Sequence, residues 1–149
     1  FDWPAILSLI QDSFAFMEGR IDPPSSMHRL TANDIAAQAR DGEVWVVGQP
    51  PVACVFLTAK PQALYLGKLA VARRYRGQGL ARVLIDMAAT RALALGLPVL
   101  ELQARVELTE NYATFRALGF TETVRTAHEG YSRPTSLTFC RRVPPEGSP

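Results

Sequence analysis

Two spacings of apolar residues in the middle of the chain predict a strand followed by a helix. Residues 64–71 form a mostly apolar run with one glycine inside, which is typical of a buried strand that carries a bulge. From residue 80 onward, apolar side chains return every three or four positions, and residues 96–98, Gly-Leu-Pro, supply a stop signal. We therefore expect a long helix that begins at the glycine-rich turn of residues 77–79.

The amino-terminal half predicts two helices and a hairpin. Residues 2–4 open a helix that is expected to end near Gly19. Its apolar face consists of Ile6, Ile10, Phe14 and Met17. A capping box at residues 31–34 opens a second, shorter helix that stops by Gly42. Two strands follow, at residues 44–47 and 52–57, joined through residues 48–51.

The carboxy-terminal half continues the alternation of strands and helices. The pattern predicts a strand at residues 98–104, a short helix at 109–118, a strand after Phe120 and a last strand at 136–142. Residues 143–149 are expected to form a frayed tail.

Length and composition favour one compact domain over residues 1–149. The chain is 48% apolar and 20% charged, which suits a single core, and no linker or repeat divides it. The formal net charge of +2 is too small to indicate nucleic acid as a partner. No run approaches the roughly twenty apolar residues of a membrane helix, and no signal-peptide pattern opens the chain. We therefore expect a cytoplasmic protein without a membrane or nucleic-acid partner.

The two cysteines suggest no chemistry. Cys54 and Cys140 lie in strand-like runs without a CxxC pairing, so buried reduced thiols are expected rather than a disulfide, a nucleophile or a metal site.

The turn between the central strand and the long helix has the chemistry of a phosphate site. Backbone N–H groups in the first turn of a helix have no partner within the helix, and the helix dipole adds partial positive charge there. Gly77 and Gly79 allow positive φ and let a ligand approach the backbone. The cationic side chains around this turn are Arg73, Arg74, Arg76 and Arg82. Together these features predict a cup for two linked phosphates.

The spacing within the turn separates this chain from two common phosphate binders. A dinucleotide fingerprint needs a third glycine where Arg82 stands, and a Walker loop needs a terminal Gly-Lys-Ser/Thr, which is absent. What remains is Arg76-x-x-Gly79-x-Ala81 after a strand that ends at Val71. This resembles motif A of the GNAT superfamily of acyl-CoA-dependent N-acyltransferases. The strand, helix, strand and Gly119-Phe120 link that follow are similar to the second half of that fold.

The resemblance implies an α/β fold with a mixed central β-sheet, flanked by helices and splayed at the cofactor site. It implies acetyl-CoA as co-substrate, without a metal, and a small-molecule or peptide amine as acceptor, and it is compatible with a homodimer. The family usually begins with a strand, which we expect to be missing before residue 1. In the family, the pyrophosphate lies on the loop that corresponds here to Arg76, Gly77, Gln78, Gly79, Leu80 and Ala81. The pantetheine arm pairs with the backbone of the preceding strand, here at Leu69 and Val71.

Direct acyl transfer to an amine makes three chemical demands. A proton must leave the amine, an N–H donor must stabilise the oxyanion, and an acid favours departure of the thiolate. A bulged strand around residues 68–71 would offer the N–H. For the acid, the family commonly uses a tyrosine where this chain has Phe115, so its hydroxyl is missing. Tyr112 becomes the candidate catalytic acid, and Asn111 and Phe115 are assigned to cofactor contact.

The sequence alone does not identify the general base or the acceptor site. The family often places a glutamate on the bulged strand, which here carries Lys68. The candidate bases that remain are Glu18, Glu101, Glu107 and Tyr131. The Pro-rich loop at residues 19–29 takes the place of the family's acceptor-binding segment, and it could equally be a surface connection.

Two other interpretations compete with an enzyme. A CoA-binding sensor without turnover would explain Phe115 and the missing strand glutamate. A nucleotide or nucleic-acid module could use the arginine cluster, although few aromatic side chains accompany it.

Overall fold

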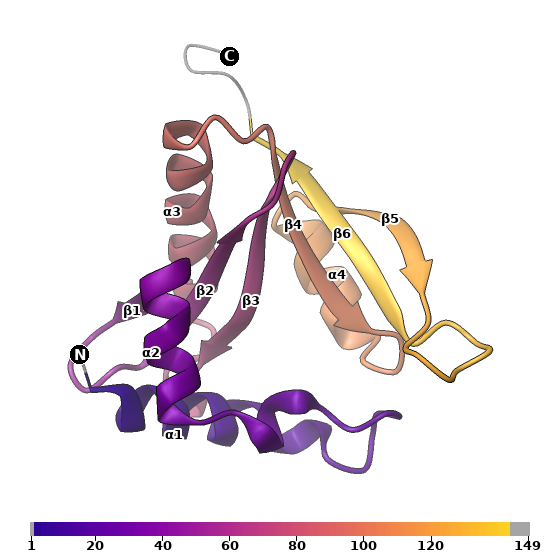
Figure 1. Ribbon diagram of the computed structural model, residues 1–149, viewed down its shortest axis with the longest axis horizontal. Coiled ribbons are helices and arrows are strands. Elements are labelled where there is room, and N and C mark those ends of the chain that lie inside the picture. Colours follow the sequence, from indigo (N-terminus) through magenta and orange to yellow (C-terminus); the bar gives the residue numbers. More distant parts are fainter. Residues whose placement is uncertain (1, 144–149) are drawn as a thin grey trace.

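The computed structural model describes residues 2–143, apart from the side chains of residues 26 and 28. Four α-helices are α1 (Trp3–Phe14), α2 (Ala32–Asp41), α3 (Leu80–Ala94) and α4 (Glu110–Ala117). The strands are β1 (Glu43–Val47), β2 (Ala53–Ala59), β3 (Leu64–Val71), β4 (Val99–Arg105), β5 (Thr121–Thr126) and β6 (Ser136–Arg142). Short 3₁₀ turns cover Ala15–Met17, Ser26–Arg29 and Arg73–Tyr75. Figure 1 shows the arrangement of these elements. The tail predicted at residues 143–149 lies, apart from Val143, outside the described residues.

The six strands form one mixed sheet in the order β1-β2-β3-β4-β6-β5. All neighbours pair antiparallel except β3 and β4, which are parallel. Their pairing is confined to Leu64 with Leu100 and Tyr65 with Glu101. Beyond these rows the two strands diverge, so that β1-β2-β3 and β4-β6-β5 form two half-sheets (Figure 1). The expected mixed sheet, splayed at its centre, is confirmed.

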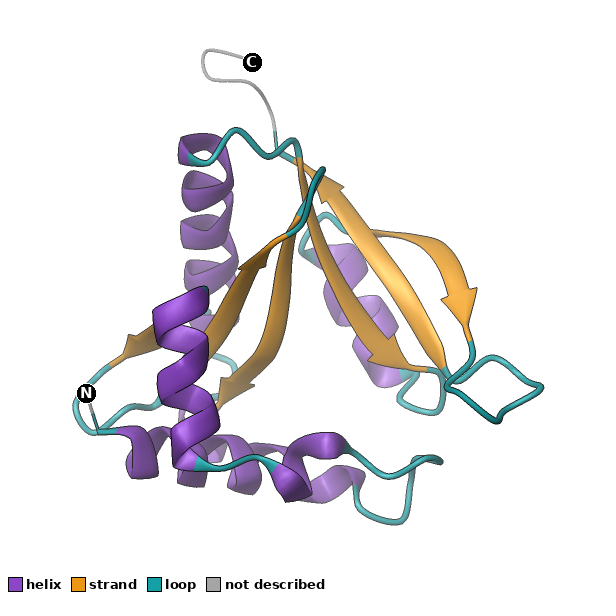
Figure 2. Cartoon of the chain, in the orientation of Figure 1, coloured by secondary structure: helices purple, strands orange, loops and turns teal. Residues whose placement is uncertain are grey.

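Helices cover both faces of the first half-sheet (Figure 2). The alternation of side chains along β2 explains why this strand is apolar throughout. Val55 and Leu57 face the core on the side of α3, whereas Cys54 and Phe56 face α1 and α2. The core on the α1 and α2 side also contains Ile6, Ile10, Met27, Ile35 and Ala70. A strand buried on both faces needs no polar side, and its sequence accordingly has none until Thr58.

The first helix is shorter than the sequence pattern predicts. It ends at Phe14, and the chain tightens into the 3₁₀ turn Ala15–Met17 rather than continuing to Gly19. The reason lies in the packing of Met17, which leaves the face formed by Ile6 and Ile10 and joins a separate small cluster with Ile21 and Leu108. The change of direction brings the following loop beneath β4 and α4.

Local signals elsewhere behave as expected. The capping box of α2 is confirmed, since Thr31 Oγ1 accepts from Asp34 N at 3.1 Å and Asp34 Oδ2 accepts from Thr31 N at 2.9 Å. Both cysteines are free thiols, and burial raises the pKa of the fully buried Cys54 to about 12. The expected burial is wrong for Cys140, which is only half-buried. Within residues 2–143, no helix combines the length and apolarity needed to cross a membrane.

Candidate active site

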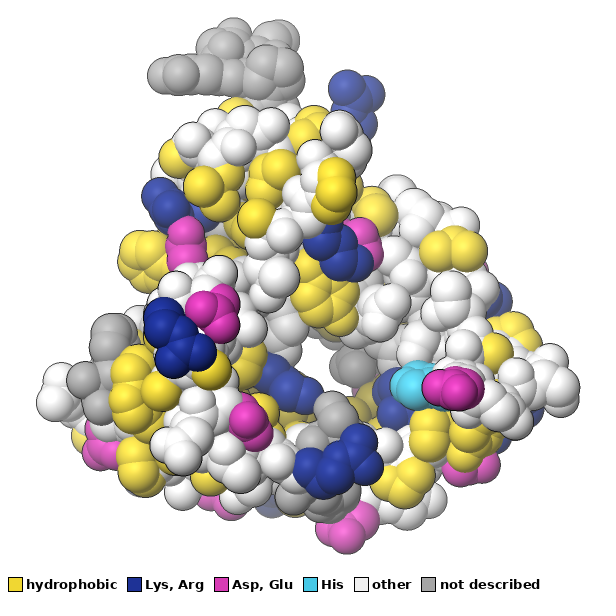
Figure 3. All heavy atoms as spheres, in the orientation of Figure 1, with side chains coloured by type: hydrophobic (Ala, Val, Ile, Leu, Met, Phe, Trp, Pro, Cys, Tyr) yellow, Lys and Arg dark blue, Asp and Glu magenta, His cyan; other side chains and the backbone are white. Residues whose placement is uncertain are grey.

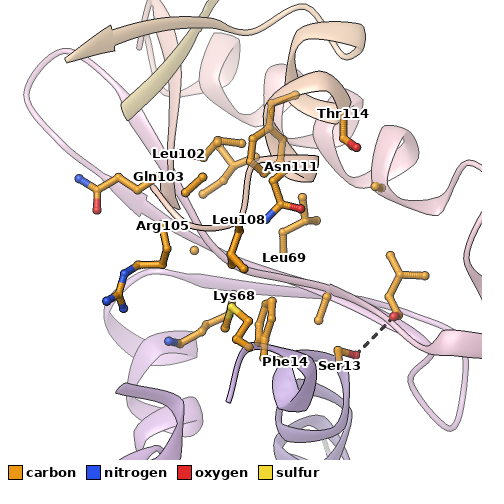
Figure 4. Close-up of a pocket in the computed structure, with 18 of the residues that line it drawn as sticks. Ser13, Phe14, Lys68, Leu69, Leu102, Gln103, Arg105, Leu108, Asn111 and Thr114 are labelled. Atoms are coloured by element: carbon orange, nitrogen blue, oxygen red, sulfur yellow. Dashed lines mark hydrogen bonds between the residues drawn. The ribbon is translucent and has the colours of Figure 1, made fainter. Parts of the chain in front are cut away.

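The divergence of β3 and β4 opens a deep cleft at the centre of the molecule. Its volume is about 1200 Å³, larger than a typical drug-sized pocket. The walls are β3, the end of α1 with the loop that follows it, the glycine turn, β4 and α4. Figure 3 shows the surface hollowed between the two halves, and Figure 4 shows side chains from these elements converging on the cleft. Past Tyr65, the edge of β3 that would pair with β4 faces this cleft.

A β-bulge lies in β3 beside the cleft. Cys54 pairs with Ala70 and Phe56 pairs with Gly67, so β3 carries one extra residue between these rows. Lys68 has a φ of 51°, an uncommon conformation for a residue other than glycine. The predicted bulge is therefore confirmed. It interrupts the hydrogen-bond ladder between β2 and β3 in the region where the sequence analysis predicted a backbone N–H available to a ligand.

The glycine turn presents a row of backbone amides without protein partners. Gly77 and Gly79 have φ of 79° and 81°, and Gly79 is the N-cap of α3 without a side-chain cap. The first helical hydrogen bond is from Val83 N to Gly79 O, and among the described residues no acceptor bonds the amides of residues 77–82. A Cβ on either glycine would meet no atom within 4 Å, so the space in front of the amides is open. The turn thus has the donors and the room that a phosphate requires.

Arg76 fixes the turn to its neighbours rather than only adding charge. Its Nε donates to Val71 O at 3.2 Å and its Nη2 donates to Ser13 O at 3.2 Å. Ser13 Oγ also donates to Val71 O, at 3.4 Å (Figure 4). These bonds connect the turn to the end of β3 and to α1, so Arg76 orients the amides that follow it.

The sequence matches the model of the acetyltransferase (GNAT) family over residues 3–120. This chain belongs to the GNAT family. Among curated proteins, no sequence matches it.

Solved structures of similar fold include acetyltransferases of low sequence identity to this chain. The ribosomal-protein-S18-alanine N-acetyltransferase from Escherichia coli is 18% identical, with a TM-score of 0.69, over 99% of this chain and 93% of that one. A GNAT acetyltransferase from Staphylococcus aureus is 14% identical, with a TM-score of 0.73, over 95% and 93%. A GNAT acetyltransferase from Elizabethkingia anophelis, solved with acetyl-CoA bound, is 15% identical, with a TM-score of 0.62, over 82% and 85%.

Most residues assigned to the coenzyme in this GNAT chain border the cleft. Those that line it are Leu69, Val71, Arg76, Gly77, Gly79, Leu80, Ala81, Asn111 and Phe115. Gln78 does not line it, and of the four arginines expected around the turn, Arg73 and Arg74 do not either. The amide of Asn111 points into the cleft from α4 (Figure 4). Phe115 contributes a ring that also packs on the core, 5.5 Å from the ring centroid of Phe139.

The structure does not bring Tyr112 into the cleft. Its hydroxyl donates to the carbonyl of Val106, and its ring lies 5.9 Å from that of Phe139. Burial raises the pKa of this hydroxyl. A shared helical face with Phe115 suggested that Tyr112 could reach the leaving thiol, but the Val106 carbonyl, which nothing local in the sequence reveals, holds the hydroxyl elsewhere.

Tyr112→Phe is therefore expected to leave acetyl transfer within about twofold of the parent rate, whereas loss of an acid would cost about 100-fold or more. The free energy of unfolding should fall by about 0.5–1.5 kcal/mol, because the Val106 carbonyl loses its donor. Thiol-release kinetics and urea unfolding measure the two effects. A hundredfold loss of rate at unchanged stability would restore Tyr112 as the acid.

None of the four candidate bases of the GNAT site lines the cleft. Glu101 pairs with Lys60 at 2.8 Å, Glu107 Oε2 accepts from Asp22 N at 3.1 Å, and Tyr131 donates to Asp22 at 2.6 Å. Glu18 lies on a separate, smaller pocket. At the bulge itself, the ionisable group is Lys68, and burial lowers its pKa.

Sequence reasoning missed the contacts that bring the loop after α1 across the cleft. Arg20 forms two hydrogen bonds to Glu110, at 2.7 and 2.9 Å. Arg105, at the end of β4, donates to the carbonyl of Pro23 and lines the cleft. The one hint of these contacts in the sequence is Arg105 itself, a charged residue at the end of a strand in which apolar and polar residues alternate. The loop predicted to receive the acceptor thus forms one wall of the cleft.

Proposed function

We propose that this chain transfers the acetyl group of acetyl-CoA to a primary amine of a small molecule or peptide by direct attack. The observation that carries the proposal is the set of unbonded amides at residues 77–82, at the amino-terminal end of α3 and beside the cleft. These amides and Arg82 would hold the diphosphate of the coenzyme. The open edge of β3 at Leu69 and Val71 would pair with the pantetheine arm as an added strand.

The residues present can meet two of the three chemical demands. The interruption of the ladder at the bulge supports Leu69 as the source of an N–H donor for the oxyanion. The positive charge of Lys68 disfavours an ammonium in the cleft, which lowers the pKa of the acceptor amine from its usual value of about 10. The proton can then leave to water.

Departure of the CoA thiolate is the step that least needs help from a protein side chain. A thiol has a pKa of about 8.5, so a thiolate departs without a neighbouring acid far more readily than an alkoxide would. In the transfer, the amine nitrogen forms a bond to the carbonyl carbon, the carbon–sulfur bond breaks, and sulfur keeps the electron pair. The absence of a hydroxyl at Phe115 is compatible with this chemistry.

An inactive acetyl-CoA sensor is the second candidate, and one observation favours it. Among the described residues that line the cleft, Glu110 is the sole carboxylate, and Arg20 already holds it. No carboxylate is thus placed to act as a base in contact with the amine. A homodimer and a cytoplasmic location stay predictions.

Two measurements on the purified protein separate these functions. Calorimetry should detect acetyl-CoA binding at micromolar or lower dissociation constant, and a screen of amines should detect amine-dependent release of free CoA thiol. Binding without release for any amine would favour the sensor. Failure to bind acetyl-CoA, together with salt-dependent binding of oligonucleotides, would overturn both in favour of a nucleic-acid module.

A further inference from the structure

The cleft is lined by far more cations than carboxylates. The cationic side chains among its described lining residues are Arg29, Lys68, Arg76, Arg82 and Arg105. Against them stands Glu110, whose two oxygens accept from Arg20 at 2.7 and 2.9 Å. Opposite charges therefore do not cancel inside the cleft, and its interior favours negatively charged ligands.

Four of these five cations fall into two groups along the cleft. Arg76 and Arg82 belong to the glycine turn, where the coenzyme phosphates are proposed to lie. Lys68 and Arg105 lie on the facing strands β3 and β4, and Figure 4 shows both side chains directed toward the same end of the cleft, away from the contact between Ser13 and Val71. The coenzyme phosphates are proposed to lie at the other group, so the charge of Arg105 needs another explanation.

Arg105 carries a donor that the protein does not use. One guanidinium nitrogen, Nη2, donates to the carbonyl of Pro23, whereas Nε is buried and has no hydrogen-bond partner. Burial lowers the pKa of this guanidinium, and the negative charge of Glu107 opposes that effect. A buried, unpaired N–H on a cation is costly. Because Nε is shielded from solvent, a ligand in the cleft would bond to the other terminal nitrogen, Nη1, which forms no hydrogen bond to the described residues.

Of the four carboxylate oxygens on the acidic residues near Arg105, three accept hydrogen bonds from other residues. Asp22 accepts from Tyr131 at 2.6 Å and from Arg133 at 3.1 Å. Glu107 Oε2 accepts from Asp22 N at 3.1 Å, while its Oε1 is buried without a partner. Neither carboxylate lines the cleft, and among the described residues neither forms an ion pair with Arg105. They offset part of the charge of Arg105 without lining the cleft themselves.

We infer that the acceptor of this chain carries an anionic oxygen group, a carboxylate or a phosphate, in addition to its amine, and that Arg105 binds this group with Lys68 beside it. The inference rests on the proposed acetyl transfer. A planar guanidinium with a free N–H matches such oxygens, and the ammonium of Lys68 adds attraction. Polyamines and aminoglycosides, which carry several positive charges, would be repelled from the same end.

Matched pairs of amines test the inference through thiol-release kinetics. The pairs are β-alanine with propylamine, phenylalanine with phenethylamine, and phosphoethanolamine with ethanolamine, and spermidine serves as a polycation. The anionic member of at least one pair should have a kcat/KM at least about tenfold higher than its partner, as expected for a charge-assisted hydrogen bond. The carboxylate and phosphate pairs show which oxygen group is preferred. Equal kcat/KM within every pair, or a preference for spermidine, overturns the inference.

Variants of Arg105 assign the preference to this residue. Arg105→Gln should raise KM for the anionic acceptor at least about tenfold while leaving the neutral partner and the acetyl-CoA dissociation constant unchanged. Arg105→Lys should retain part of the preference, because it keeps the charge and loses the planar donors. Arg142→Gln, at an exposed residue outside the cleft, is the matched control. It should change neither the KM of either acceptor nor the acetyl-CoA dissociation constant. An equal loss for both acceptors in Arg105→Gln would mean that the residue only supports the loop through Pro23.

The experiment also distinguishes failure of this inference from failure of the proposed function. Transfer to neutral and anionic amines alike would leave acetyl transfer standing and remove the inference. If no amine releases thiol, acetyl transfer fails, and calorimetry with the CoA-saturated protein then decides the inference. Tighter binding of β-alanine or phosphoethanolamine than of propylamine or ethanolamine would support it, and equal or absent binding would overturn it.

Discussion

Gly79→Asp is expected to weaken acetyl-CoA binding by at least about 100-fold, the equivalent of two lost charge-assisted hydrogen bonds of about 1.5 kcal/mol each. The added Cβ would enter open space in front of the unbonded amides, so its carboxylate would take the place of a phosphate and repel the other one. The helix itself should tolerate the change, because Asp is favoured at N-caps and adopts positive φ more readily than most residues.

Calorimetry with acetyl-CoA measures this effect, and the other end of the same helix offers a matched control. Gly96 also has a positive φ, of 71°, and open space at its Cβ position. Gly96→Asp should therefore carry a similar backbone strain with no loss of affinity. Unchanged affinity in Gly79→Asp would contradict the phosphate site, whereas equal losses in both variants would indicate damage to α3.

Phe139→Ala is expected to lower the free energy of unfolding by about 3–5 kcal/mol. The side chain is fully buried on β6, between β4 and β5 in the sheet. Its ring centroid lies 5.5 Å from that of Phe115 and 5.9 Å from that of Tyr112, so it anchors α4 to the second half-sheet. Truncation would leave a cavity beneath the helix that carries Asn111.

Urea unfolding followed by circular dichroism measures the loss. Phe16→Ala removes the same ring from a position that is 37% exposed and should cost less than about 1 kcal/mol. A loss of similar size in both variants would show that Phe139 is not part of the core.

Several elements could be predicted from the sequence because their signals are local. The bounds of β3 and β6 agree with the strands predicted at residues 64–71 and 136–142. Helix α3 begins directly after Gly79 and ends two residues before Gly96, since glycines and the 3.6-residue period mark a helix within a single stretch of chain. The bulge in β3 followed from one glycine in an apolar run, although the positive φ falls on Lys68 rather than on Gly67.

The parts that could not be predicted depend on residues far apart in the chain. The early end of α1 reflects the packing of Met17 against Leu108, and the loop position reflects the bond from Arg105 to Pro23, 82 residues away. Helical periodicity placed Tyr112 near Phe115 correctly, but periodicity carries no information on which carbonyl will accept its hydroxyl proton. Local patterns thus specify the elements, while the chemistry at their ends is determined by tertiary contacts.

The two rows that join β3 to β4 have a consequence for how heat would denature this protein. Because β3 and β4 pair over only two rows, few main-chain hydrogen bonds oppose separation of the two half-sheets. A ligand that bonds to the free edge of β3 and also contacts α4 would link the two half-sheets for as long as it is bound. Occupancy and thermal resistance are then coupled, because binding to the native state alone shifts the unfolding equilibrium in proportion to the logarithm of ligand concentration.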